Sequence, residues 1–559
     1  MKSYYFILLC TVILLFIGFS ESTAQINIDS LLNEYSKVRG NKIIPESVIK
    51  DSSNIKKCGF STVIPLFLQR HKMTEYQLKR YKEYTTRPVN QKSIVSQSGF
   101  FRIHFDTSGA NVPSYDVVKL SEALDSAYLV EVTEFGFNPT PSDNGEGGDN
   151  KYDVYIENIG GYYGYTQPEN EISPGSNKYS SYMSINCNFA GFYTTGLNAA
   201  KVTAAHEFHH AIQMGGYVLK ESNGDYEDLF FYELTSTSME EFVFDYINDY
   251  YGYMKSYFTN PDMALQNQSG YNLALWNIFL KKRFGKDLFV KQWNHFISKR
   301  ALMAIELSLN SYNSSFYDEF KEFSTWLYFT NYRAISGKYF EEAQFFPVTL
   351  KPMVTSQFGY PSSLLKINAK PTSINYLRFI NKNSGRNDTL AILITNSDID
   401  KGTISPNLSL PFEYELSAKT GDGFYTIMDG FYYGKLSAQQ LLYFSNREVV
   451  NDVLIDSINI IKKELDYVYP SPFKYSLHNS INISLKGNES GIADVFIYDV
   501  GMNCVFNQRT TIKNKFGLKT IEWNGFSNKN EKLGSGVYIY VVKTSLETIK
   551  GKLVIVNDK

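Results

Sequence analysis

Residues 205–213 of this 559-residue chain read Ala-His-Glu-Phe-His-His-Ala-Ile-Gln. Helix-favouring residues extend over residues 199–214, and the glycines at 215–216 follow as a stop signal, so we expect one helix there. His206 and His210 are four residues apart, which places both imidazoles on one face of that helix, one turn apart. Two ring nitrogens in this arrangement can bind one metal ion at about 2.0–2.1 Å.

Glu207 follows the first of these histidines and leans to the side of the expected ion. Zinc lowers the pKa of water, and a carboxylate beside it can accept the proton during attack on a peptide carbonyl. Glu207 is therefore the candidate catalytic base. His209 is offset from the ligand face and is expected to pack or to support a ligand. With only seven histidines in the chain, this spacing rarely arises by chance, although a structural histidine pair is the alternative.

A catalytic zinc needs a third protein ligand and an open fourth position. Sites with a third histidine would require Gly at 213 and His at 216, where this chain has Gln213 and Gly216. The other type takes a glutamate from a following helix, and Glu233 lies among apolar and small residues, where a buried carboxylate needs a cation. Glu240 shares the face of Glu233 and is expected to orient a ligand histidine, or to replace Glu233 as third ligand. The alternative for Glu240 and Glu241 is a solvated helix edge.

Peptide hydrolysis also needs a group that stabilises the negative charge developing on the carbonyl oxygen. Tyr217, Tyr271 and His295 have suitable side chains, and nothing in their sequence positions chooses among them.

The overall composition excludes some function classes. Lys and Arg number 55 and Asp and Glu 57, so no net charge directs the chain to nucleic acid or to anionic membranes. Aromatic residues reach 16%, and their abundance favours β structure outside the helical region.

The first residues are typical of a secretion signal. Lys2 precedes an apolar run over residues 5–19, and the small residues Ser22 and Ala24 predict cleavage after residue 24. No later stretch is apolar enough to cross a bilayer, so we expect no stable membrane span. Export leaves three cysteines, of which Cys58 and Cys187 could form a disulfide; separate buried thiols are the alternative.

An ordered series of short motifs resembles a family of secreted bacterial gluzincin-like metalloproteases. The matching stretches include residues 101–109, 153–156, 164–166 and 205–213, with Tyr232-Glu233 after them. The resemblance extends over about residues 55–350 and implies a zincin fold, a Zn²⁺ cofactor and Glu233 as a family glutamate. The family has Gly-Thr-Ala after this glutamate, where this chain has Leu-Thr-Ser.

The C-terminal stretch resembles a sorting domain of the type IX secretion route, which is similar to Ig-like modules. The matching residues are 469–473, 495–499, 523–525, 534–538 and 551–553. This resemblance implies recognition by an outer-membrane secretion machinery and a secreted or cell-surface protein. A plain Ig-like domain is the alternative.

Together these features predict an α+β multidomain protein, in which a zincin-like, mostly helical catalytic domain precedes two β-sandwich-type domains. The expected function is a secreted zinc metallopeptidase acting on proteins or peptides. The alternatives are a non-catalytic surface adhesin or binding protein on a zincin scaffold, and a metal-dependent hydrolase of another substrate. The expected boundaries are a signal peptide at 1–24, a lead-in or propeptide-like segment at 25–95, the metallopeptidase domain at 96–350, a β-rich domain at 351–462 and the sorting domain at 463–559.

Overall fold

The computed structural model divides into two compact units. The first comprises Met1–Asp125, Thr140–Gly215 and Leu219–Glu227, and the second comprises Ser126–Pro139, Gly216–Val218 and Asp228–Lys559. The expected signal peptide lies outside the described residues. The structure describes residues 27–39, 55–222, 225–347, 354–357, 362–381, 388–407, 410–419, 423–427, 436–444, 468–469, 472–476, 478, 480–485, 491–515, 518–546 and 548–558.

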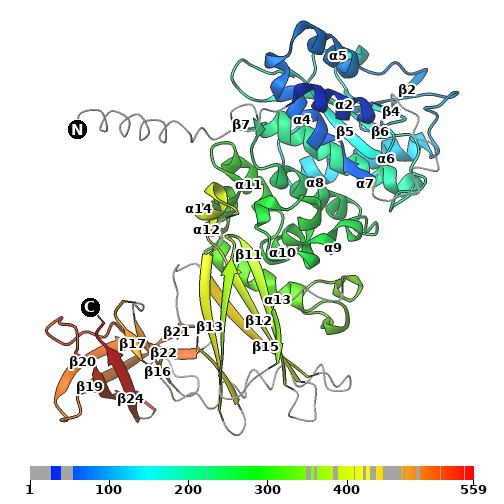
Figure 1. Ribbon diagram of the computed structural model, residues 1–559. Helices are drawn as coiled ribbons and strands as arrows, with labels where there is room; N and C mark the ends of the chain where they lie inside the picture. The colour runs from blue at the N-terminus through cyan, green and yellow to red at the C-terminus, as the bar shows by residue number, and fades with distance from the viewer. Residues whose placement is uncertain are drawn as a thin grey trace, which may run out of the picture. The chain divides into compact units, whose positions relative to one another are not determined.

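A six-stranded mixed sheet is the centre of the first unit, with strand order β1-β5-β6-β4-β3-β2 (Figure 1). The pairs β1–β5, β3–β4 and β4–β6 are parallel, whereas β2–β3 and β5–β6 are antiparallel. Strands from the expected lead-in segment therefore form both edges of the sheet. The strands are β1 (Lys56–Cys58), β2 (Lys92–Val95), β3 (Phe101–Phe105), β4 (Tyr152–Glu157), β5 (Tyr162–Glu171) and β6 (Tyr179–Asn186).

The inner strands are buried on both faces. Every residue of β4 and β6 is buried, as are the first seven of β5. Tyr, Ser and Thr occupy many of these positions, so β5 and β6 lack the alternation of apolar and polar residues that reveals a strand with one solvated face. Alternation of apolar and polar residues is present in Phe101–Phe105 of β3 but absent from β5 and β6.

Helices cover this sheet and extend the first unit. Helix α7 packs against β5 and β6, and α4 packs against β5. A capping box fixes the start of α5, because Thr74 and Gln77 exchange side-chain to backbone hydrogen bonds. The helices are α2 (Ile28–Val38), α4 (Phe60–Leu68), α5 (Glu75–Thr85), α6 (Val117–Tyr128, which crosses the unit boundary) and α7 (Gly196–Ile212).

The second unit begins with a helical array. Phe231, Trp293 and Phe296 lie in mutual ring contact at its centre, with ring centroids 4.9–5.2 Å apart. Helix α8 ends at Val243, because Phe244 leaves helical geometry with φ −131° and ψ 58°. The helices are α8 (Leu229–Val243), α9 (Tyr251–Thr259), α10 (Ala274–Phe284), α11 (Asp287–Phe296), α12 (Ala301–Asn310) and α13 (Phe316–Tyr328).

Two sheets and a short helix, α14 (Ile399–Ile404), follow this helical array. One sheet has the order β15-β12-β11-β9 and the other β10-β13-β14. The strands are β9 (Val354–Gln357), β10 (Ser362–Ala369), β11 (Ser373–Asn381), β12 (Asp388–Asn396), β13 (Leu410–Lys419), β14 (Gly423–Ile427) and β15 (Leu436–Phe444).

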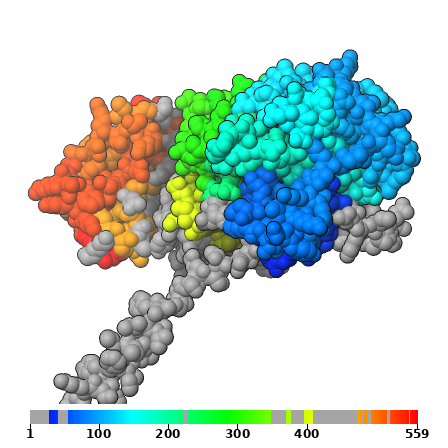
Figure 2. Space-filling model, turned by 90° about the horizontal axis from the view of Figure 1, so that it is seen from above, coloured from blue at the N-terminus to red at the C-terminus, as the bar shows by residue number. Residues whose placement is uncertain are grey.

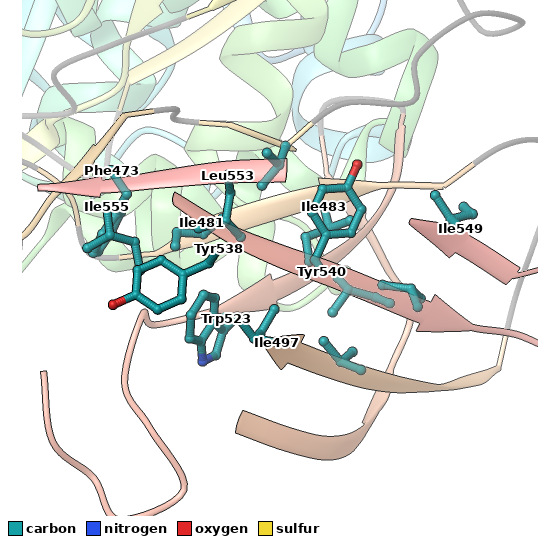
Figure 3. Packing of buried hydrophobic residues seen from close by; sticks show 14 of the residues in the cluster. Phe473, Ile481, Ile483, Ile497, Trp523, Tyr538, Tyr540, Ile549, Leu553 and Ile555 are labelled. Atoms are coloured by element: carbon teal, nitrogen blue, oxygen red, sulfur yellow. The ribbon is translucent and has the colours of Figure 1, made fainter. Parts of the chain in front are cut away.

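The C-terminal strands build a body with its own core, orange to red in Figure 2. Ile483 and Trp523 come from a four-stranded sheet and Ile497 and Tyr540 from a five-stranded one, and Figure 3 shows these side chains gathered in one cluster. The strands are β16 (Val468–Tyr469), β17 (Phe473–Lys474), β18 (Ile481–Ser484), β19 (Ile492–Tyr498), β20 (Cys504–Thr511), β21 (Lys513–Lys515), β22 (Leu518–Trp523), β23 (Gly536–Lys543) and β24 (Thr548–Val556).

The structure thus confirms a multidomain α+β protein, with helices and several sheets. No helix among the described residues is long and apolar enough to span a membrane. Cys58, Cys187 and Cys504 form no disulfide, so separate thiols are the arrangement found. The zincin and sandwich assignments and the predicted boundaries stay predictions.

Candidate metal centre

The histidine motif lies in the C-terminal half of α7, as its sequence predicted. Ala-rich turns bring this helix close to β5 and β6, and all its residues from Val202 to Ile212 are buried. His206 is 1% exposed, and Glu207 and His210 are completely buried. Burial of three ionisable side chains on one helix is costly unless each is paired or binds an ion.

The two histidine rings converge on one point. Their Nε2 atoms are 3.2 Å apart, close to the separation of about 3.3 Å between two nitrogens on one tetrahedral zinc. Nδ1 of His210 lies 2.8 Å from Oε1 of Gln213, a contact in which Nδ1–H donates and Nε2 keeps its lone pair. The ring of Phe60 stacks on His210 with centroids 4.0 Å apart. Gln213 and Phe60 therefore orient His210.

Glu207 is held by β5. Oγ1 of Thr166 lies 2.8 Å from Oε2 of Glu207 and 2.9 Å from its backbone oxygen, so the hydroxyl donates to one of them. Oε1 is buried and lies on the side of the carboxyl away from this contact with Thr166. Burial raises the pKa of the Glu207 carboxyl, whereas the neighbouring His206 and His210 and hydrogen bonds with Cys58 and Thr166 lower it. Thr166 and Cys58 thus lie on the Glu207 carboxyl inside the buried site.

The close approach of β5 to α7 depends on Gly164. A Cβ atom there would lie 2.6 Å from Cγ2 of Thr203 and 2.8 Å from Cγ of Glu207. Because neither atom lies at the end of a long flexible chain, any larger residue would displace the helix and with it the carboxylate.

His209 is also completely buried, and burial is the main cause that lowers its pKa. It therefore packs as a neutral imidazole.

Glu233 lies on α8 and is completely buried. The Tyr271 hydroxyl donates to its Oε1 at 2.8 Å. Gly270 makes this contact possible, because its φ of +87° suits glycine and a Cβ there would lie 2.5 Å from Cβ of Glu233. Glu240 and Glu241 are 1% and 8% exposed, so the alternative of a solvated helix edge is wrong. The orienting role of Glu240 stays a prediction.

The structure brings together a group of four buried side chains with metal-ligating atoms. Cys58, His206, His210 and Glu233 each offer one such atom, and these atoms lie within 4.8 Å of one another. Imidazole nitrogen, carboxylate oxygen and thiolate sulfur are the donors that zinc takes in proteins, so the residues present fit this ion. Sequence reasoning missed Cys58, which it considered only as a disulfide partner. It also missed the orienting roles of Gln213 and Phe60.

The three candidates for stabilising an oxyanion have different surroundings. The Tyr217 oxygen accepts a hydrogen bond from the backbone N–H of Asn138 at 3.3 Å, and burial raises its pKa to about 12. Tyr271 contacts Glu233, as described above. His295 lies half-buried near the end of α11. Among these three, Tyr271 alone is hydrogen-bonded to a predicted metal ligand.

No protein-family model and no curated protein matches the chain. Among solved structures, one similarity is to PorZ, described as an essential bacterial surface component of the type IX secretion system of Porphyromonas gingivalis. It has 12% identity over 33% of this chain and 30% of PorZ, with a TM-score of 0.14.

A second similarity is to dimeric latent PorU, also from Porphyromonas gingivalis. It has 13% identity over 35% of this chain and 20% of PorU, with a TM-score of 0.13. Both alignments therefore span less than a third of the other protein, and TM-scores this low do not establish a shared fold.

The Thr166 hydroxyl leads to a first prediction. Replacing it with the isosteric Thr166→Val removes a hydroxyl donor beside the buried Glu207, so the metal-free protein should lose about 1–3 kcal/mol of stability. Thr203→Val is the matched control, because that buried hydroxyl donates to the backbone oxygen of Ala199 and serves no carboxylate. Thermal unfolding of the two variants measures the difference. An equal loss in both would show that Thr166 does not support Glu207.

Proposed function

We propose that this protein is a zinc-dependent metallopeptidase. The observation that supports this most is the buried group of His206, His210 and Glu233, with Glu207 beside the histidine pair on the same helix. Two histidines and a glutamate are a ligand set of zinc peptidases, and a neighbouring glutamate supplies the base that such sites need.

The bound ion would supply a Lewis acid that polarises the peptide carbonyl and makes water more acidic. Glu207 accepts the proton of the attacking water at Oε1, while Thr166 contacts Oε2. The same carboxyl then donates the proton to the departing amine. Gln213 keeps His210 in the tautomer whose Nε2 lone pair faces the ion. Tyr271 orients Glu233 through its hydrogen bond.

Two rival functions differ in what they require of Glu207. A non-catalytic surface adhesin or binding protein on the same scaffold needs the metal ligands at most, and no proton acceptor. A hydrolase of a non-peptide substrate needs the acceptor but would not cleave protein. The anchored, buried carboxylate next to the histidine pair favours a catalytic role.

The metal assignment predicts one zinc ion per chain by elemental analysis. His206→Ala and His210→Ala should each abolish binding, because an incomplete ligand set cannot hold the ion. His71→Ala, which removes an exposed histidine, is the control and should bind normally. Glu233→Ala should weaken binding more than Glu240→Ala does. The reverse order would make Glu240 the third ligand.

The assignment of Glu207 as base predicts separate effects on binding and hydrolysis. Glu207→Gln preserves the side-chain shape but cannot accept the proton, so zinc should remain while cleavage of labelled casein falls about a hundredfold or more. Glu83→Gln changes an exposed glutamate of α5 and should leave the rate unaltered. Undiminished cleavage by Glu207→Gln would remove this residue from the mechanism.

We further propose that the C-terminal body directs export through a type IX route. Support comes from the residues resembling a sorting domain and from the separate core around Ile483, Ile497 and Trp523, which lets this body be recognised on its own.

Deletion of residues 467–559 tests this proposal. All three proposed ligands lie between residues 206 and 233, so the truncated protein should still bind zinc. It should cross the inner membrane and accumulate behind the outer one, as cell fractionation with an activity assay would show. Normal amounts of active truncated enzyme in the medium would leave these residues as a plain Ig-like module.

A further inference from the structure

Cys58 is built into the surroundings of Glu207 by the backbone of β1. Its register partner in the parallel β1–β5 pair is Gly164, the residue that packs on the Glu207 side chain. The next residue continues this contact, since the Gly59 N–H donates to the Gly164 oxygen at 2.8 Å. The end of β1 is therefore fixed beside the carboxylate.

The sulfur of Cys58 is placed as a metal ligand would be. It is buried, with the residue 1% exposed, and lies within 4.8 Å of the ligand atoms of His206 and His210. The Phe60 N–H donates a hydrogen bond to Sγ at 3.2 Å, an interaction that favours the electron-rich sulfur of a metal thiolate. The same Phe60 stacks on His210, so one short segment supports both the sulfur and a ligand ring.

The role of the Cys58 sulfur depends on how many protein ligands the zinc has. A catalytic zinc has three protein ligands and an open position, whereas four protein ligands close the tetrahedron. His206, His210 and Glu233 supply three donors, and Cys58 offers a fourth within 4.8 Å of them.

We propose that the Cys58 thiolate is a fourth protein ligand that closes the metal site, so that the chain is latent until this sulfur is withdrawn. This inference rests on the proposed metallopeptidase function. On withdrawal the Cys58 thiolate would take up a proton, and one coordination position would become open to water.

The fold allows the sulfur to leave without dismantling the core. Strand β1 has three residues, lies at an edge of the sheet and pairs with β5 alone in the described part of the chain. Helix α4 begins directly after it and is anchored by fully buried Phe60 and Ile64. Peeling of β1 therefore moves Cys58 while Phe60 stays against His210.

Cobalt substitution tests this assignment without relying on activity. Wild-type protein loaded with Co²⁺ should show the near-ultraviolet charge-transfer absorption of a cobalt–thiolate bond. Cys58→Ala and Cys58→Ser should lose this absorption yet keep one metal ion per chain. Cys187→Ser is the matched control, because Cys187 is also buried but its sulfur lies 3.6 Å from the backbone oxygen of Ala110 and not in the metal group.

The zinc forms of the same proteins test latency. Cys58→Ala should cleave labelled casein about tenfold faster or more than wild type, because it opens the fourth position to water. Far-ultraviolet circular dichroism verifies that each variant is folded, and Cys58→Ser provides a replacement of similar size.

Each contrary result has a distinct meaning. An unchanged cobalt spectrum in Cys58→Ala would overturn sulfur ligation, while one bound metal ion would leave the proposed function standing. Loss of both the metal and the casein cleavage in folded Cys58 variants would identify a structural metal site and overturn latency. Absence of metal from every protein, wild type included, would instead refute the proposed function itself.

Discussion

Desolvation of polar groups on α7 is the constraint on which the rest of the first unit depends. His206, Glu207, His210 and Gln213 have at most 1% of their surface exposed. Water cannot compensate them, so neighbouring groups must do so, and an uncompensated buried polar group is strongly destabilising. The Thr166 hydroxyl contacts the Glu207 carboxylate, and the Gln213 side-chain oxygen accepts a hydrogen bond from His210. We propose a cation as the partner of the remaining ring nitrogens.

Such compensation works only at short range, which explains why glycines stand where secondary-structure elements meet near the site. Gly164 lets β5 reach the side of α7, and Gly270 lets Tyr271 reach Glu233. In both places a single added carbon would collide with the side chain that the contact serves. The close backbone packing at these two glycines therefore also sets the positions of the Glu207 and Glu233 carboxylates.

Local spacing made part of this site predictable. His206, Glu207 and His210 were predicted from the spacing and Glu207's position, and the helix expected over residues 199–214 is α7, Gly196–Ile212. Long-range pairing made the rest unpredictable. Nothing near Cys58 in the sequence shows that β1 pairs with β5, and β5 itself has no alternating pattern to reveal it. In the sequence, Gln213 indicated only that a third-histidine type of zinc site is absent. In the structure, its side-chain oxygen accepts a hydrogen bond from Nδ1 of His210. The fold class was predictable because helical and strand patterns occupy different stretches, whereas the order of strands depends on contacts across the whole sheet.

The pairing of β1 with β5 also has a consequence for when the site comes into being. About 100 residues separate the two strands, and parallel pairing over such a distance closes late because loop entropy must be overcome first. Nascent chain therefore carries the donor residues long before they can act together. Uptake of the proposed metal would then coincide with the completion of folding. Since copper and nickel compete strongly with zinc for such donors, the compartment where folding finishes would then determine which metal occupies the proposed site.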